Sequence, residues 1–124
     1  MKYLCLAYEE ERKLNALSES EWHALRDETL SYVEDIRKRG HLVVTHALQS
    51  VETATTVRVR NGRLSATDGP FAETKETLGG FFLIEARDLN DAIQVAANWP
   101  SARIGSIEVR PIQEELPTER RYTA

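Results

Sequence analysis

The chain has 124 residues, the length of one domain and enough for a hydrophobic core without metal or disulfide support. Hydrophobic residues make up 41% and charged residues 29%, a composition that excludes a disordered chain. The formal net charge of −4 lacks the basic character of a nucleic-acid-binding domain, so we expect no direct nucleic-acid partner.

The first predicted element is a strand over residues 2–8, which carries apolar side chains on both faces, as strands in the middle of a sheet do. This stretch is too short for a membrane span, which takes roughly 18 apolar residues. It is also too short for a signal peptide, because it leads directly into Glu9 and further acidic residues. The single cysteine, Cys5, has no partner for an internal disulfide. We therefore expect a cytoplasmic protein without a membrane partner.

Residues 18–39 carry the clearest helix signals. Ser18 and Glu21 have the spacing of a capping box at the start of the helix. Gly40 ends the helix, because glycine accepts the left-handed conformation that follows a last helical turn. Side chains at spacings of three and four form one stripe that we expect to be buried: Trp22, Leu25, Thr29, Val33 and Ile36.

A strand over residues 41–48 comes next, and a hairpin follows with strands over 55–60 and 63–68. Asn-Gly at 61–62 supplies the two positive φ angles that a type I′ turn requires. A two-residue turn fixes the register of the strands. This register pairs four apolar side chains on one face of the hairpin: Val57 with Ala66, and Val59 with Leu64.

Residues 68–80 are predicted to form a turn followed by a loop, and residues 81–86 a second strand that is apolar on both faces. A second helix is predicted over 89–98. It begins after Asp88, whose side chain can accept hydrogen bonds from free N–H groups of the first turn. It ends before Pro100, which cannot continue a helix.

The last strand is predicted over 106–112, so we expect one domain over 1–112 and a polar tail over 113–124. The order of elements is βαβ, an inserted hairpin and a second βαβ. Right-handed crossovers place both helices on one face of the sheet. This is the split βαβ, or ferredoxin-like, arrangement of the α+β class, in which the strands over 2–8 and 81–86 are central.

Both central strands carry large apolar side chains toward the sheet face that the two helices leave uncovered. Burying each such side chain is worth roughly 1.5–3 kcal/mol. A patch of this size seldom stays exposed on a monomer. Packing of two sheets against each other across a two-fold axis would bury it. We therefore expect a homodimer, with clefts between the sheet, the loops and the partner subunit.

Three segments carry a family likeness: ATTVRVR at 54–60, TDGPFAETKETLGGF at 67–81 and GSIEVRP at 105–111. They resemble the DGPF branch of the YCII-related proteins, and the resemblance extends over about residues 1–112. It implies a ferredoxin-like dimeric α+β barrel, which agrees with the arrangement expected from the pattern of elements.

The resemblance also bears on function. Some YCII-like relatives resemble dehalogenating or hydrolytic enzymes that use a His-Asp dyad, with the histidine in the first helix. Here His23 lies in that helix, but its neighbours depart from the pattern, and Thr29 stands at the equivalent distance before the helix-ending glycine. The dyad is therefore not carried over. DGPF-type proteins also resemble partners encoded beside extracytoplasmic-function sigma factors, which implies a regulatory role and a sigma-factor-type protein partner.

Within the central motif, Asp68 has two interpretations that stay open. It can stabilise a turn together with the glycine and proline that follow it. It can also stand at the mouth of a cleft with Glu73 and Lys75, where these groups could bind a polar ligand or act as acid and base. His46, placed on one strand face with Leu42, is either a hydrogen-bonded core residue or a base that faces the cleft.

No spacing of the three histidines and the single cysteine indicates a metal site, and we expect neither a metal nor a cofactor. Two hypotheses about function remain. The first is a homodimeric small-molecule-binding or regulatory module, and the second is a hydrolase or lyase with Asp68 or His46 as the catalytic base. Seven residues are predicted to line the ligand site: Tyr3, Tyr8, His46, Asp68, Phe71, Glu73 and Lys75.

Overall fold

The computed structural model describes residues 1–122. Its main sheet has four antiparallel strands in the order β2-β5-β1-β6. These strands are β1 (Lys2–Glu9), β2 (Leu42–Ala47), β5 (Thr77–Glu85) and β6 (Ser106–Pro111). This order, with β1 and β5 in the centre, confirms the predicted ferredoxin-like α+β fold.

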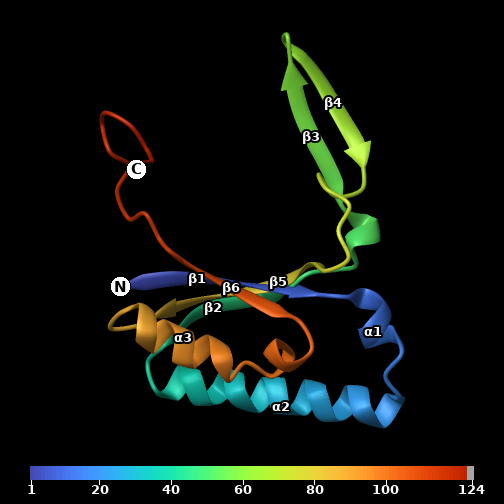
Figure 1. Ribbon diagram of the computed structural model, residues 1–124, viewed down its shortest axis with the longest axis vertical. Coiled ribbons are helices and arrows are strands. Elements are labelled where there is room, and N and C mark those ends of the chain that lie inside the picture. The colour runs from blue at the N-terminus through green and yellow to red at the C-terminus, as the bar shows by residue number, and fades with distance from the viewer. Residues whose placement is uncertain (123–124) are drawn as a thin grey trace.

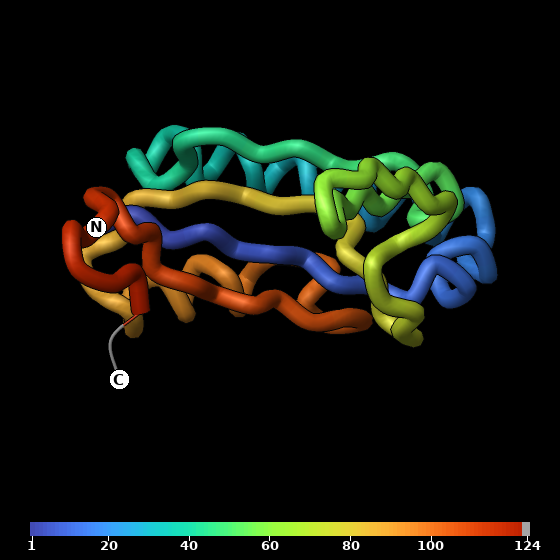
Figure 2. Tube along the Cα trace, turned by 90° about the horizontal axis from the view of Figure 1, so that it is seen from above, coloured from blue at the N-terminus to red at the C-terminus, as the bar shows by residue number. Residues whose placement is uncertain are grey.

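The helices cover one face of the sheet, and the hairpin rises from the other (Figure 1). Figure 2 shows the sheet from the hairpin side, with the hairpin over one end and the C-terminal segment over the other. The middle of this face is therefore bare of helices. The remaining elements are α1 (Glu11–Asn15), α2 (Glu19–Lys38), η1 (Val51–Thr53), β3 (Thr55–Arg60), β4 (Arg63–Asp68), α3 (Leu89–Ala97) and η2 (Pro100–Arg103), where η marks a short 3₁₀ helix.

The predicted capping signals hold both long helices at their starts. The Ser18 Oγ accepts a hydrogen bond from the Glu21 N–H at 3.1 Å, and the Ser18 N–H donates to Glu21 Oε1 at 2.8 Å. The Asp88 carboxylate accepts from the Asp91 N–H at 2.8 Å before α3. Gly40 follows α2 with φ +80°, as predicted for a glycine that ends a helix.

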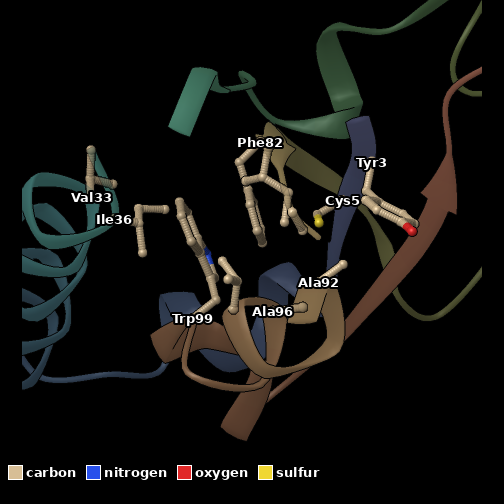
Figure 3. Close-up of a cluster of buried hydrophobic side chains, with 11 residues drawn as sticks. Tyr3, Cys5, Val33, Ile36, Phe82, Ala92, Ala96 and Trp99 are labelled. Atoms are coloured by element: carbon tan, nitrogen blue, oxygen red, sulfur yellow. The ribbon is translucent and has the colours of Figure 1, made fainter. Parts of the chain in front are cut away.

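The core lies between the sheet and the helices (Figure 3). Phe82 of β5 stacks on Trp99, which follows α3, with the ring centroids 3.9 Å apart and the planes at 7°. Tyr32 of α2 meets the Trp99 ring edge-on, and its hydroxyl donates to the Val95 carbonyl at 2.6 Å. These contacts join α2, α3 and the sheet, and they give the partly buried Tyr32 hydroxyl a hydrogen-bond acceptor.

The structure corrects two features of the predicted sheet. β5 begins at Thr77 and not at residue 81, because Gly79 and Gly80, predicted as loop, are part of the strand. Gly80 pairs with Ala7 on one side and Ala47 on the other, so pairing with two neighbours overrides the weak strand preference of glycine. The short helix α1 was not predicted.

A second correction concerns β2. An irregularity between Leu42 and Val44 shifts the register, so Leu42 pairs with Ile84 and His46 with Phe81. Ile84 lies on the buried helix side, whereas Phe81 lies on the face without helices. His46 therefore shares a face with Val44 but not with Leu42, contrary to the prediction.

The hairpin forms as predicted. Asn61 and Gly62 take φ values of 52° and 75°, and the pairs Val57–Ala66 and Val59–Leu64 are present. Its apolar face is not covered, since Val57, Val59 and Leu64 are 62%, 60% and 73% exposed. The hairpin thus presents apolar side chains to solvent on the same side of the molecule as the bare sheet face.

Candidate functional site

A cavity of about 290 Å³ lies between the helix side of the sheet and the N-terminal half of α2. Its walls are largely apolar, and the residues that form them include Ala7, Trp22, Leu25, Leu30, Val33 and Trp99. Trp22 and Leu25 belong to the stripe predicted to be buried, but Trp22 is 45% exposed. The stripe packs closely on the core only at its C-terminal end, where Val33 and Ile36 are buried, and the space beside its N-terminal end forms the cavity.

Glu9, the last residue of β1, contributes a carboxylate to this cavity. Side chains of a strand alternate between faces, so Glu9 follows Tyr3, Cys5 and Ala7 onto the helix side. Ala7 pairs with Gly80 and Tyr8 with Leu78, which leaves Gly79 as an extra residue in β5, a β-bulge. A Cβ atom at position 79 would overlap Glu9 Oε1, so the absence of a side chain there makes room for the carboxylate.

Burial raises the pKa of Glu9 above its ordinary value, and the negative charge of Glu11 adds to this effect. Glu11 behaves in the opposite way: hydrogen bonds from the Ser50 hydroxyl and the Val51 N–H, both at 2.7 Å, lower its pKa. Within residues 1–122 no side chain or backbone group donates to the Glu9 carboxylate or pairs with its charge, and its oxygens keep contact with solvent. Of these two neighbouring acids, Glu9 is therefore the one that holds its proton to higher pH and has acceptor sites free.

Few other polar side chains face the cavity. The hydroxyl of Thr29 donates to the Leu25 carbonyl at 2.8 Å, and that of Thr45 donates to the Phe81 carbonyl at 2.9 Å. Arg26 lies at the rim, where its guanidinium is 3.6 Å from the Asp27 carboxylate. Both threonine protons are thus already used within the chain. Ser101 adds a hydroxyl to the lining, and Glu9 supplies its carboxylate.

A second cavity, of about 660 Å³, lies at the base of the hairpin. It brings together two of the predicted site residues, Tyr8 and Phe71, with Pro70 and Leu78. Phe71 is 82% exposed, so this cavity is open to solvent on the Phe71 side. Lys75 lines a third open hollow between α1 and η1, and Glu73 is exposed nearby in the chain.

Two further predicted site residues, Tyr3 and His46, lie away from the hairpin base. Tyr3 is 2% exposed in the core under the sheet, where its hydroxyl is 3.7 Å from the Met1 sulfur. His46 is among the residues that border the cavity beneath α2, but it is exposed and pairs with Phe81 on the face without helices, with the two ring centroids 5.8 Å apart. In the part of the chain that the structure describes, His46 has no carboxylate within ion-pair distance. The arrangement that a His46 base requires is therefore not formed within one subunit.

Asp68 ends β4 and is exposed. The turn after it is held by other groups: the Gly69 N–H donates to the Ala54 carbonyl, and the Thr56 hydroxyl donates to the Gly69 carbonyl, both at 2.8 Å. Gly69 has φ +104°, which explains a glycine at this position. The turn therefore does not depend on a hydrogen bond to the Asp68 carboxylate.

Sequence reasoning missed Glu9 because it ended the first strand at residue 8 and used the acidic residues that follow only to argue against a signal peptide. The alternation of side chains along the strand nevertheless indicated the position of Glu9. Extending the alternation of the first strand by one residue puts Glu9 on the buried side, behind Ala7. Residues 1–122 contain no cluster of three or more side chains suited to holding a metal ion. No helix among them has the length and apolar character needed to cross a bilayer.

Comparison with known proteins identifies the family. The family model of the YCII-related domain matches residues 1–115. The chain belongs to the YCII-related domain family. An uncharacterised protein of Rhizobium meliloti, R00369, is 34% identical over 121 residues, which covers 96% of this chain and 98% of that protein.

A solved structure shares the fold of this YCII-related chain. It is the 5-chloro-2-hydroxyhydroquinone dehydrochlorinase TftG from Burkholderia phenoliruptrix AC1100, in complex with 2,5-dihydroxybenzoquinone. The two structures superpose with a TM-score of 0.57, over 93% of this chain and 96% of TftG, at 14% sequence identity. At this identity the likeness establishes the ferredoxin-like fold and nothing about the reaction.

Proposed function

We propose that this YCII-related protein is a homodimeric small-molecule-binding module and that the cavity beneath α2 is its binding site. The observation that carries the proposal is the cavity itself, with apolar walls and a single unpaired carboxylate, since ligand sites combine apolar walls with a few placed polar groups. Its volume of about 290 Å³ lies just below the range of such sites, roughly 300–1,000 Å³. The expected ligand is therefore compact, of about one ring.

The bare face of the sheet supports the dimer. Six large side chains of β1, β2 and β5 lie on this face with no helix over them: Leu4, Leu6, Tyr8, Val44, Phe81 and Leu83. On the edge strand β6, the same face carries Ser106, Glu108 and Arg110. An apolar centre with a polar margin is the composition of a protein interface, and a second copy packed sheet to sheet would cover it.

A regulatory role and a sigma-factor-type partner stay predictions that rest on the resemblance to the DGPF branch. An enzyme of the hydrolase or lyase type is the second candidate. One observation favours it: Glu9 is a partly buried carboxylate with a raised pKa in a cavity, which is the setting of many general bases. In that case Glu9, and not Asp68 or His46, is the group placed to accept a proton.

The binding proposal can be tested by fluorescence, because both tryptophans of the chain, Trp22 and Trp99, line the cavity. A set of one-ring compounds should contain members that change the tryptophan emission saturably. The substitution Leu25→Phe, which fills the cavity, should weaken that response, whereas Leu89→Phe on the exposed part of α3 should not. A response that is equal in both variants, or absent for every compound, would count against the proposed site.

A further inference from the structure

We infer that the cavity beneath α2 selects neutral, one-ring alcohols of the phenol class, whose hydroxyl group donates a hydrogen bond to Glu9. This inference rests on the proposed function, because it names the ligand class for the same site. It assigns Glu9 the role of the residue that determines specificity. The apolar walls contribute affinity that does not depend on the hydroxyl group.

The position of Glu9 supports a donor as its partner. The carboxylate leaves the end of β1 toward the helix side and lies against the Gly79 backbone, where a Cβ atom would be 2.6 Å from Glu9 Cδ. Its oxygens border the cavity and receive no hydrogen bond from residues 1–122. The Glu9 carboxylate is partly buried and no residue of 1–122 donates to it, so a ligand that brings a donor and displaces the remaining water satisfies an acceptor that the chain leaves open. The occupant must therefore present an O–H or N–H group at this end of the cavity.

The surrounding charge selects against anions. Glu11 lies close enough to Glu9 to raise its pKa, and its own carboxylate is held in the charged form by Ser50 and Val51. A ligand carboxylate or phosphate next to Glu9 would add a third negative group to this pair of acids. Arg26 does not offset this, since it is more than half exposed at the rim beside Asp27. A negatively charged ligand is thus disfavoured at the Glu9 end.

A buried ammonium group is disfavoured for a different reason. The walls of the cavity are apolar, and taking a cation and a carboxylate out of water together costs desolvation energy that the attraction between them often fails to recover. A neutral hydroxyl donor does not carry this cost. Trp22 and Trp99 supply flat aromatic walls, against which a ring can pack by stacking or by edge contact. Together these features indicate a ring with a neutral hydroxyl.

The test compares phenol with toluene, which has nearly the same shape but no donor, by tryptophan fluorescence titration or calorimetry. In the wild-type protein phenol should bind about tenfold or more tightly than toluene, as expected for a hydrogen bond to a charged group. In Glu9→Met this preference should fall by about tenfold while toluene binding is retained. Glu10→Met is the matched control, because Glu10 pairs with Lys13 at 3.6 Å and does not line this cavity. Glu10→Met should bind phenol more tightly than toluene by the same factor as the wild-type protein does.

Each outcome separates the inference from the proposed function. If neither compound binds the wild-type protein, both the site and the ligand class are wrong. If toluene binds as well as phenol, and Glu9→Met changes nothing, the cavity binds small molecules but Glu9 does not select hydroxyl donors. Benzoate is the third probe, and tighter binding of benzoate than of phenol would overturn the argument from charge. Glu9→Gln keeps the shape of the side chain and one carbonyl acceptor, and it replaces Glu9→Met if that variant fails to fold. Its preference for phenol over toluene should lie between those of wild type and Glu9→Met.

Discussion

The side chain of Glu9 occupies the space that a side chain at position 79 would need. A Cβ atom on Gly79 would overlap Glu9 Oε1 and lie 2.6 Å from Glu9 Cδ. The neighbouring glycine differs, because a Cβ atom on Gly80 would lie 2.9 Å from the His46 carbonyl oxygen, which belongs to the backbone of β2. The first obstacle is the end of a flexible side chain, and the second is part of the sheet.

This difference predicts unequal effects of two alanine substitutions. Gly80→Ala should lower the free energy of unfolding by about 1–3 kcal/mol, because the strands must move apart. Gly79→Ala should cost less, because the Glu9 carboxylate can rotate away, but it should weaken the binding of hydroxyl ligands by moving their acceptor. Urea unfolding followed by circular dichroism measures both stabilities. Equal losses of stability in the two variants would contradict this account.

The pH dependence of stability should show the burial of Glu9. Because its pKa is raised in the folded state, the folded protein binds this proton more tightly than the unfolded chain does. The stability that Glu9 contributes is therefore fully present below its ordinary pKa of 4.5 and is lost as the pH rises through the raised value. Glu9→Gln should remove this loss, so the variant gains stability relative to wild type as the pH rises from about 4 to 7.

The pH dependence of stability must be compared between the wild-type protein and Glu9→Gln, because other acids also titrate in this range. Glu11, Glu21, Glu28 and Asp91 have lowered pKa values, so the stability that they contribute is lost as the pH falls. The wild-type curve is the sum of these opposite effects, and only the difference between wild type and Glu9→Gln isolates Glu9. A difference that stays constant from pH 4 to 7 would show that the carboxylate is not shifted.

Much of the fold follows from local signals in the sequence. The capping box at Ser18 and the Asn-Gly pair at 61–62 fix their elements through contacts within a few residues, and both elements form as predicted. The start of β5 was missed, because glycine disfavours strands locally. Gly79 and Gly80 are in the strand only because β1 and β2 lie on either side. Pairing between distant segments is not visible in the local pattern.

The candidate site was harder to predict for the same reason. The cavity is bounded by residues from β1, β2, α2, β5 and the segment after α3, so its shape depends on how these elements pack. The motif that contains Asp68 and Phe71 drew attention to the hairpin base, but the structure brings only Phe71 and Tyr8 together there. Glu9 could have been found from strand alternation, whereas the space beside it could not.

Cys5 should be inert toward thiol reagents in the folded protein. Its side chain is fully buried in β1, and burial raises the pKa of the thiol to about 12, so almost no thiolate is present at neutral pH. A disulfide reagent added at pH 8 should react only when the protein is unfolded in urea, and the rate should then follow the unfolding transition. The raised pKa also means that stability is lost as the pH rises from 9.0 toward 12. Rapid labelling of the native protein would contradict the burial of Cys5.

A charge on the bare face of the sheet should disrupt the proposed dimer. Leu6 of β1 and Leu83 of β5 lie on this face, and Leu6→Glu or Leu83→Glu would place a carboxylate where a second sheet is proposed to pack. Sedimentation at micromolar concentration should give a dimer for the wild-type protein and a monomer for both variants, with circular dichroism unchanged. Ile93→Glu is the matched control, because Ile93 is 44% exposed on α3, on the other side of the sheet, and that variant should stay dimeric. A wild-type monomer, or variants that remain dimeric, would show that the second copy does not pack on this face.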